Sequence, residues 1–214
     1  EDLGGFIGRV QTGSSVIINN CASYGEIVSN YKQGSYNSKS SMNLGGFAGY
    51  IGSAQDRIMN CIFAGSLDLG SDFTDKSNVT AFGYWNAIGS VDNCYYLKNS
   101  VPNTNAGAAT PSVKEMTSVT TEQLSSGEVT HKLNSSLSYG VWKQTIGTHA
   151  YPVFNGDTVY YCNNEFGYKN NDPHNMLNGV CSVCGEYEAP QLNQNEYYEI
   201  YNAAQLFWFE RLVN

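Results

Sequence analysis

Charged residues, and cations above all, are scarce in this 214-residue chain. They make up 14% of it, whereas an average soluble domain has roughly 25%. Because 11 Lys and Arg stand against 19 Asp and Glu, the formal net charge is −8. Contacts to phosphates need clustered cations, and the cations here are scattered singly. We therefore expect no nucleic-acid partner.

Long hydrophobic runs are also missing. The longest candidate for a membrane span, at 206–209, has four residues, whereas a span needs about 20. We therefore expect no membrane insertion in this segment. No basic region followed by an apolar region opens the chain, so we expect a signal peptide to be absent or already removed. The six cysteines are too few for a disulfide-dense scaffold.

Small and neutral polar residues take the place of charge. The chain has 24 Asn, 22 Gly, 22 Ser and 12 Thr, together with 16 Tyr. Gly and Asn are unfavourable inside helices and favour turns, which excludes a long helical bundle. An aromatic content of 13% argues against disorder. The composition therefore predicts an ordered fold with many turns.

A sequence pattern recurs through the first hundred residues. Its parts are a Gly-Gly-Phe-x-Gly segment and, after a variable turn, an Ile-x-Asn-Cys segment. The copies lie at 3–8 with 18–21, at 44–49 with 58–61, and, in degenerate form, at 79–84 with 91–94. Each piece is short, alternates apolar and polar residues, and is bounded by turn formers, which is typical of strands. No piece can bury its apolar face alone, but stacked units can.

This repeat predicts a mostly β fold with a right-handed parallel β-helix, a solenoid, over residues 1–98. Its units lie near 3–29, 44–69 and 79–97, and equivalent side chains should lie about 4.8 Å apart. The expected internal columns are Phe6, Phe47 and Phe82; Ile18, Ile58 and Val91; and Cys21, Cys61 and Cys94, with the thiols reduced and packed as small hydrophobes. Asn20, Asn60 and Asn93 should form corners, because Asn tolerates left-handed backbone and its amides can bond along the stack.

The repeat residues resemble the GLUG motif, a glycine-rich repeat of bacterial surface and secreted proteins, clostridial ones among them. The resemblance covers roughly residues 3–97 and departs from the motif in the third unit, where Thr80 and Ala81 replace Gly-Gly. The segments at 93–97, 121–129 and 151–154 are also similar to family members. The resemblance implies an extracellular or cell-surface location and a structural or adhesive role.

Residues 99–156 are expected to cap the solenoid. Small residues and prolines over 99–118 predict a loop. Thr120 followed by Gln123 is a capping-box pattern for a helix near 121–134, with Leu124, Val129 and Leu133 on one face. An open solenoid end exposes apolar side chains and unpaired strand edges, and this helix would cover them.

A small Cys/His module is expected over 157–190. Cys162, His174, Cys181 and Cys184 lie within 23 residues, and the last two form a CxxC followed by Gly. Three thiolates and an imidazole suit a tetrahedral structural zinc ion. The stretch from 174 to 185, including Gly179, also resembles Cys/His modules of clostridial surface proteins. A disulfide among these cysteines, or free thiols, remain alternatives.

The last segment, 191–214, is expected to be a linker and an amphipathic helix. Asn202 is the expected N-cap with Gln205 three residues later, and Leu206, Phe209 and Val213 fall on one side. In GLUG-type proteins a segment like 198–206 opens a repeat array, so the chain resembles a fragment ending at the start of a following unit. We also consider that this helix covers the open edge at residues 4–10 of a neighbouring molecule, which would give self-association.

No catalytic motif stands out. None of the three histidines lies in HExxH, and neither a P-loop nor a dinucleotide fingerprint is present. Asp56 with Arg57, Asp68, and Asp72 with Asp75 are the acids a glycan-cleaving enzyme could use, but we interpret them as solvated turn residues.

Two functions follow from the sequence. The leading one is a non-catalytic structural or adhesive module that presents a solenoid face to a host or extracellular protein or a glycan. The insertion at 31–42, with Tyr31 and Tyr36, is a candidate contact loop, although a plain solvated loop is the simpler interpretation. The alternative is a carbohydrate-active enzyme, a lyase or hydrolase, on the same scaffold.

Overall fold

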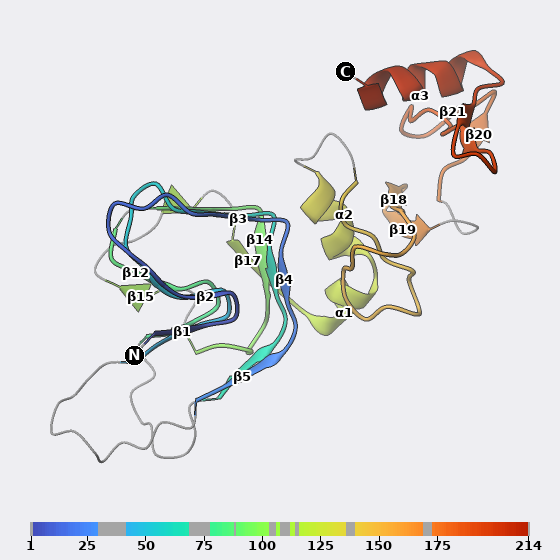
Figure 1. The fold of residues 1–214 in the computed structure, drawn as a ribbon. Coiled ribbons are helices and arrows are strands. Elements are labelled where there is room, and N and C mark those ends of the chain that lie inside the picture. Colours follow the sequence, from blue (N-terminus) through green and yellow to red (C-terminus); the bar gives the residue numbers. More distant parts are fainter. Residues whose placement is uncertain are drawn as a thin grey trace, which may run out of the picture. The chain divides into compact units, whose positions relative to one another are not determined.

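The computed structural model shows a mostly β chain whose contacts divide into two units, Glu1–Thr121 and Glu122–Asn214 (Figure 1). It describes residues 2–29, 42–68, 78–87, 89–102, 106–107, 112–113, 116–135, 140–168 and 173–213. Within these ranges, no helix has the length and apolar character to cross a membrane.

Short strands of the first unit follow one another in four sets, which we call rows. The first row is β1 (Asp2–Gly4), β2 (Ile7–Val10), β3 (Ile17–Asn19), β4 (Ala22–Ser23) and β5 (Glu26–Val28). The second is β6 (Asn43–Gly45), β7 (Ala48–Ile51), β8 (Arg57–Met59), β9 (Ile62–Phe63) and β10 (Ser66–Asp68). The third is β11 (Val79–Thr80), β12 (Tyr84–Trp85), β13 (Ser90–Asp92) and β14 (Cys94–Leu97), and the fourth is β15 (Ala106–Gly107), β16 (Ser112–Val113) and β17 (Met116–Val119).

Each strand pairs in parallel with its counterpart in the next row. The sheets are β1-β6-β11, β2-β7-β12-β15, β3-β8-β13-β16, β4-β9-β14-β17 and β5-β10. In Figure 1 the chain traces of successive rows run side by side. Ile58 is opposite Ile18 on one side and Val91 on the other, so the predicted register of the three repeat units is confirmed.

The fourth row lies where the sequence predicted only a loop. The loop prediction for 99–118 was wrong, because β15, β16 and β17 pair with the third row. The segment lacks the apolar alternation that marks a strand, and its pairing is supplied by the edge of the row before it. The first unit consequently extends to Thr121 rather than ending near residue 98.

An aromatic column runs through the first unit as expected. The rings of Phe6 and Phe47 stack with centroids 5.2 Å apart, and those of Phe47 and Phe82 with centroids 5.5 Å apart. Phe47 and Phe82 are fully buried, whereas Phe6, in the first row, is 49% exposed. The column therefore has an inner part and an uncovered end.

Asparagine corners join the strands within each row. Asn20, Asn60 and Asn93 have φ of 53°, 50° and 47°, which confirms the predicted left-handed backbone. The Asn93 amide donates to Asn60 Oδ1 at 2.9 Å, but Asn60 donates to Asn19 Oδ1, also at 2.9 Å. The predicted amide ladder therefore ends on Asn19, and Asn20 Oδ1 is buried without a partner among the described residues.

A second polar ladder, which the sequence analysis missed, runs beside β1, β6 and β11. The Asn78 amide donates to Asn43 Oδ1 at 2.8 Å, and the Asn43 amide donates to Asp2 Oδ1 at 2.6 Å. Arg9 Nε donates to the other oxygen of Asp2 at 2.6 Å. One side chain per row thus ties the rows together outside the apolar columns.

Glycine is required where β6 turns into β7. A Cβ on Gly45 would lie 2.0 Å from the carbonyl oxygen of Ala48, so no other residue fits there without moving the backbone. The equivalent Gly4 would meet the carbonyl oxygen of Ile7 at 2.2 Å. This close approach explains why the repeat begins with glycine.

The second unit begins with two short helices, α1 (Thr121–Ser125) and α2 (Glu128–Asn134), where a single helix was expected. Gly127 separates them with φ of 91°, a left-handed conformation that ends helical propagation. Leu124, Val129 and Leu133 are fully buried, as the pattern predicted. That this segment caps the stack stays a prediction.

Three antiparallel hairpins and a last helix complete the second unit. They are β18 (Val159–Cys162) with β19 (Glu165–Tyr168), β20 (Met176–Leu177) with β21 (Val180–Cys181), β22 (Gln191–Leu192) with β23 (Tyr198–Glu199), and α3 (Ala203–Val213). Asn202 caps α3 as predicted, because its Oδ1 accepts a hydrogen bond from the backbone amide of Gln205 at 2.9 Å. The Gln205 side chain in turn accepts the Tyr201 amide at 2.7 Å.

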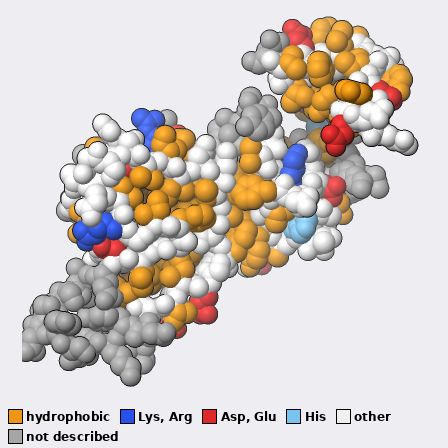
Figure 2. Space-filling model, in the orientation of Figure 1, with side chains coloured by type: hydrophobic (Ala, Val, Ile, Leu, Met, Phe, Trp, Pro, Cys, Tyr) orange, Lys and Arg blue, Asp and Glu red, His pale blue; other side chains and the backbone are white. Residues whose placement is uncertain are grey.

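Helix α3 packs on the Cys/His module. Phe207 lies 5.5 Å from the ring of Tyr187, and Arg211 pairs with Glu186 at 3.3 Å. The predicted helix is confirmed, and Leu206 and Val213 of its expected apolar side are exposed. That the helix covers the edge at 4–10 of a neighbouring molecule stays a prediction. Figure 2 shows hydrophobic side chains at the surface of this part.

Truncation of the aromatic column should cost stability only where the ring is enclosed. We expect Phe47→Ala to lower the free energy of unfolding by about 3–5 kcal/mol, because it leaves a cavity between two stacked rings. Phe6→Ala is the matched control and should cost about 1 kcal/mol, because half of that ring is already in water. Urea unfolding of the full chain measures both, and equal losses would contradict an ordered column.

Candidate metal centre and the adjoining cleft

The Cys/His module is built on two tight turns. Asn178 and Gly179, with φ of 52° and 78°, turn β20 into β21. A Cβ on Gly179 would lie 2.8 Å from that of Ala204, so this glycine also lets α3 approach. After β21, the Gly185 amide donates to the carbonyl of Cys181 at 2.9 Å, and Gly185 has φ of 76°. The chain thus folds back on itself between the two cysteines of CxxC.

Three of the four predicted ligand side chains, Cys162, His174 and Cys184, come together, and Cys181 lies beside Cys162. Cys162 ends β18, His174 precedes β20, Cys181 ends β21 and Cys184 follows it. The ligand atoms of Cys162, His174 and Cys184 all lie within 4.8 Å of one another. Cys181 Sγ lies 3.7 Å from Cys162 Sγ. This cluster has the composition and spacing to hold a metal ion.

The thiols of this cluster differ in acidity. Backbone amides, those of Cys184 first and Val183 next, donate to Cys181 Sγ and lower its pKa to about 6. Burial, together with Cys181 and Cys184, raises the pKa of Cys162 to about 12. At neutral pH the cluster therefore contains a thiolate at Cys181 beside a protonated Cys162.

The 3.7 Å between Cys162 Sγ and Cys181 Sγ bears on the zinc, disulfide and free-thiol alternatives that the sequence left open. Two thiolates on one tetrahedral zinc ion, each about 2.3 Å from it, lie about 3.8 Å apart. A disulfide needs about 2.05 Å. All six cysteines are free thiols in the structure, and the observed separation suits two ligands of one metal.

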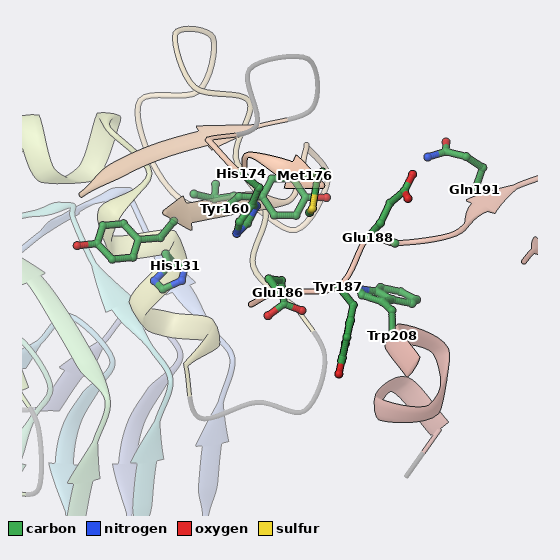
Figure 3. A pocket seen from close by; sticks show the side chains of 12 residues that line it. His131, Tyr160, His174, Met176, Glu186, Tyr187, Glu188, Gln191 and Trp208 are labelled. Carbon is green, nitrogen blue, oxygen red and sulfur yellow. The ribbon is translucent and has the colours of Figure 1, made fainter. Parts of the chain in front are cut away.

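A cleft of about 770 Å³ adjoins the cluster (Figure 3). Its lining comes from α2, β18, the segments around β20 and β22, and α3: His131, Val159, Tyr160, Tyr161, His174, Met176, Glu186, Tyr187, Glu188, Ala189, Gln191 and Trp208. His174 belongs to both the cleft and the cluster. The lining is rich in rings, contains two carboxylates, and includes neither Lys nor Arg.

The electrostatics of the cleft are negative. Glu186 Oε1 accepts from Arg211 at 3.3 Å, and Glu188 Oε2 accepts from the Asn202 amide at 3.2 Å. Burial, with a contribution from Lys132, lowers the pKa of His131, so this imidazole is neutral at pH 7. The sequence analysis missed the cleft because its residues are dispersed over 78 positions, from His131 to Trp208, without a motif.

The acids weighed as catalytic have other roles or lie outside the described ranges. Asp56 is buried, which corrects its interpretation as a solvated residue. Its carboxylate accepts the backbone amides of Val16 at 2.9 Å and Ser53 at 3.0 Å, and so joins two rows. Arg57 and Asp68 are exposed. The candidate residues Asp72, Asp75, Tyr31 and Tyr36 fall outside the described residues.

The repeat cysteines pack as a column. Cys61 and Cys94 are fully buried. The sulfur of each lies close to the carbonyl two residues earlier, that of Met59 at 2.9 Å and that of Asp92 at 3.2 Å. Cys21 is half-buried at the uncovered end. The Cys61 thiol donates to Cys21 and lowers its pKa to about 7, whereas burial raises the pKa of Cys61.

Alkylation should therefore single out one thiol of this column. Because the pKa of Cys21 is about 7 and the thiolate is the nucleophile, its reaction with iodoacetamide should accelerate from pH 6 to pH 8 and level off above that. Cys61 and Cys94 are internal controls and should react only after unfolding. Peptide mass spectrometry follows all three, and equal labelling of Cys21 and Cys94 in the folded chain would contradict the packed column.

Comparison with models of protein families, with curated proteins and with solved structures gives no match to this chain. Its function therefore has to be inferred from three features of its own: the parallel rows, the Cys/His cluster and the acidic cleft.

Proposed function

We propose that the first unit is a right-handed parallel β-helix and that the chain is a non-catalytic structural and adhesive module of a bacterial surface or secreted protein. The observation that supports this is the in-register parallel pairing of four successive rows. Such a stack offers long outer faces for contact with extracellular proteins or glycans. The resemblance of the repeat to the GLUG motif favours the same role and an extracellular location.

The polar groups of the first unit favour a scaffold over an enzyme. Both oxygens of Asp56 accept backbone amides, and the Cys61 and Cys94 thiols are enclosed. A general acid or nucleophile needs access to a substrate and a partner group. These groups instead stabilise the rows.

The second unit, in this proposal, is held by one structural zinc ion. Cys162, His174, Cys181 and Cys184 would be its ligands, a donor set that zinc prefers in structural sites. Four protein ligands would leave no open position for a substrate. The ion would join the β18 hairpin to the β21 turn, where few side chains other than Cys162 and Cys181 are buried.

We expect one zinc ion per purified chain and none in Cys184→Ser. Cys21→Ser, which removes a thiol outside the cluster, is the control and should keep its zinc. Elemental analysis measures the zinc content of both variants.

Zinc binding must displace the proton of Cys162, whose pKa is about 12, so zinc binding should release protons and should weaken as the pH falls. Calorimetry in two buffers of different ionisation enthalpy measures the release, and a disulfide between Cys162 and Cys181 would contradict the zinc site.

The adhesive role predicts binding without turnover. The full chain should be retained on at least one class of immobilised extracellular protein or glycan, and the bound ligand should be recovered chemically unchanged.

Asp56→Asn should lower the melting temperature, because the carboxylate that accepts two backbone amides is replaced by a neutral amide. Release of reducing ends from a polysaccharide by the wild type, abolished in a folded Asp56→Asn variant, would favour the carbohydrate-active enzyme instead.

A further inference from the structure

The cleft beside the Cys/His cluster has features that a purely structural module does not need. Its volume of about 770 Å³ falls in the range of ligand sites, roughly 300–1,000 Å³. Tyr160, His174 and Met176 lie together on one side of it, and Tyr187 and Trp208 lie together on the other (Figure 3). Flat rings on two walls can hold a ligand that presents apolar faces.

The carboxylates of the cleft are only partly used by the protein. Arg211 bonds one oxygen of Glu186, and Asn202 bonds one oxygen of Glu188. The second oxygen of each has no partner among the described residues. Arg211, which does not line the cleft, pairs with Glu186 and lies 4.8 Å over the Tyr187 ring, so it balances one of the two carboxylates. With neither Lys nor Arg in the lining itself, the remaining negative charge favours a cationic ligand and disfavours sialylated, sulfated or uronic-acid glycans.

The backbone of the segment 186–188, which lines one side of the cleft, is already hydrogen-bonded within the protein. Tyr187 forms a bridge with Val180, and the Glu188 amide donates to the carbonyl of Gly179 at 2.8 Å. The carbonyl of Glu186 accepts from the Cys181 amide, also at 2.8 Å. An extended peptide could not add a strand to this segment, so recognition there depends on side chains.

We infer that this cleft is a binding site for oligosaccharides that carry free amino groups, with glucosamine residues as the ligand class. The C–H faces of the sugar rings would stack on Tyr187 and Trp208. The ammonium groups would donate charge-assisted hydrogen bonds to Glu186 and Glu188, and the Gln191 amide would bond sugar hydroxyls. The inference rests on the glycan contact of the proposed function and specifies its chemical class.

The metal cluster should control the same site. The walls come from β18 on one side and from the segment after Cys184 on the other, and Cys162 with Cys184 joins those elements at the cluster. His174 lies in both. Loss of the ion would therefore let β18 and the segment after Cys184 move relative to each other. Ligand binding would weaken as a result, although no ligand atom contacts the metal.

Titration calorimetry of the zinc-loaded full chain tests the inference with three probes of equal length. They are a glucosamine tetramer, its N-acetylated counterpart, and tetralysine, at a pH where the amines are protonated. We expect the glucosamine tetramer to bind at least about tenfold more tightly than the N-acetylated one, which corresponds to one charge-assisted contact. Glu186→Gln and Glu188→Gln should each weaken it about fivefold.

Glu26→Gln is the matched control, because it removes an exposed acid of the first unit and should leave the affinity unchanged. Equal affinity for both tetrasaccharides would overturn the charge selection but leave a glycan contact in place. Tighter binding of tetralysine, with the same dependence on the two glutamates, would overturn the glycan assignment in favour of a basic peptide. Binding of no probe by folded, zinc-loaded protein would overturn the inference, whereas the adhesive role is decided separately by the panel of immobilised ligands.

Discussion

Each corner of the first unit must turn the chain while it stays in register with the corner of the next row. Asparagine meets both demands. Its backbone adopts positive φ at Asn20, Asn60 and Asn93, at little cost for this residue type. At the same corners the backbone amide of Asn20 donates to the carbonyl of Met59 at 3.1 Å, and the backbone amide of Asn60 donates to the carbonyl of Asp92 at 3.0 Å. The phenylalanine, isoleucine and cysteine columns all depend on this register, because a slip of one residue would turn each side chain to the opposite face.

The repeated part of the fold could be predicted from the sequence because it repeats. Equivalent positions such as Phe6, Phe47 and Phe82 can be recognised because they recur, and stacking of the units brings them into one column. The fourth row could not be predicted, since its pairing depends on the neighbouring edge rather than on its own apolar pattern. Asp56 was misinterpreted for a related reason: its partners, Val16 and Ser53, are backbone amides that no motif reveals.

The candidate site was predictable to a similar degree. The CxxC spacing and the following glycine indicated that Cys181 and Cys184 lie close together, because local turn geometry alone places two thiols side by side. The cleft was not predictable, because Glu186, Glu188 and Trp208 acquire a common surface only through the packing of α3 on Tyr187. The break of the predicted helix at Gly127 also depends on the backbone conformation at that glycine, which the capping pattern does not determine.

The two units are stabilised by different means. The first buries continuous columns of side chains, among them Phe47, Ile58 and Trp85. The C-terminal part of the second leaves many apolar side chains exposed, among them Leu177, Val183 and Leu192. Small folds with little core commonly need a metal or disulfide, and in the proposed function a zinc ion at the Cys/His cluster would supply that constraint. The proposed ion would also join the elements that line the acidic cleft.

Residue-resolved hydrogen exchange of the full chain, with and without zinc, tests the register-locked stack most directly. The amides of Ile62 and Tyr95, which donate to the carbonyls of Cys21 and Cys61 in the row before, should exchange slowest and should not respond to removal of the metal. The amides of Cys181 and Gly185 should exchange faster once the ion is gone. Rapid exchange at Ile62 and Tyr95 in the folded protein would contradict the stacked rows.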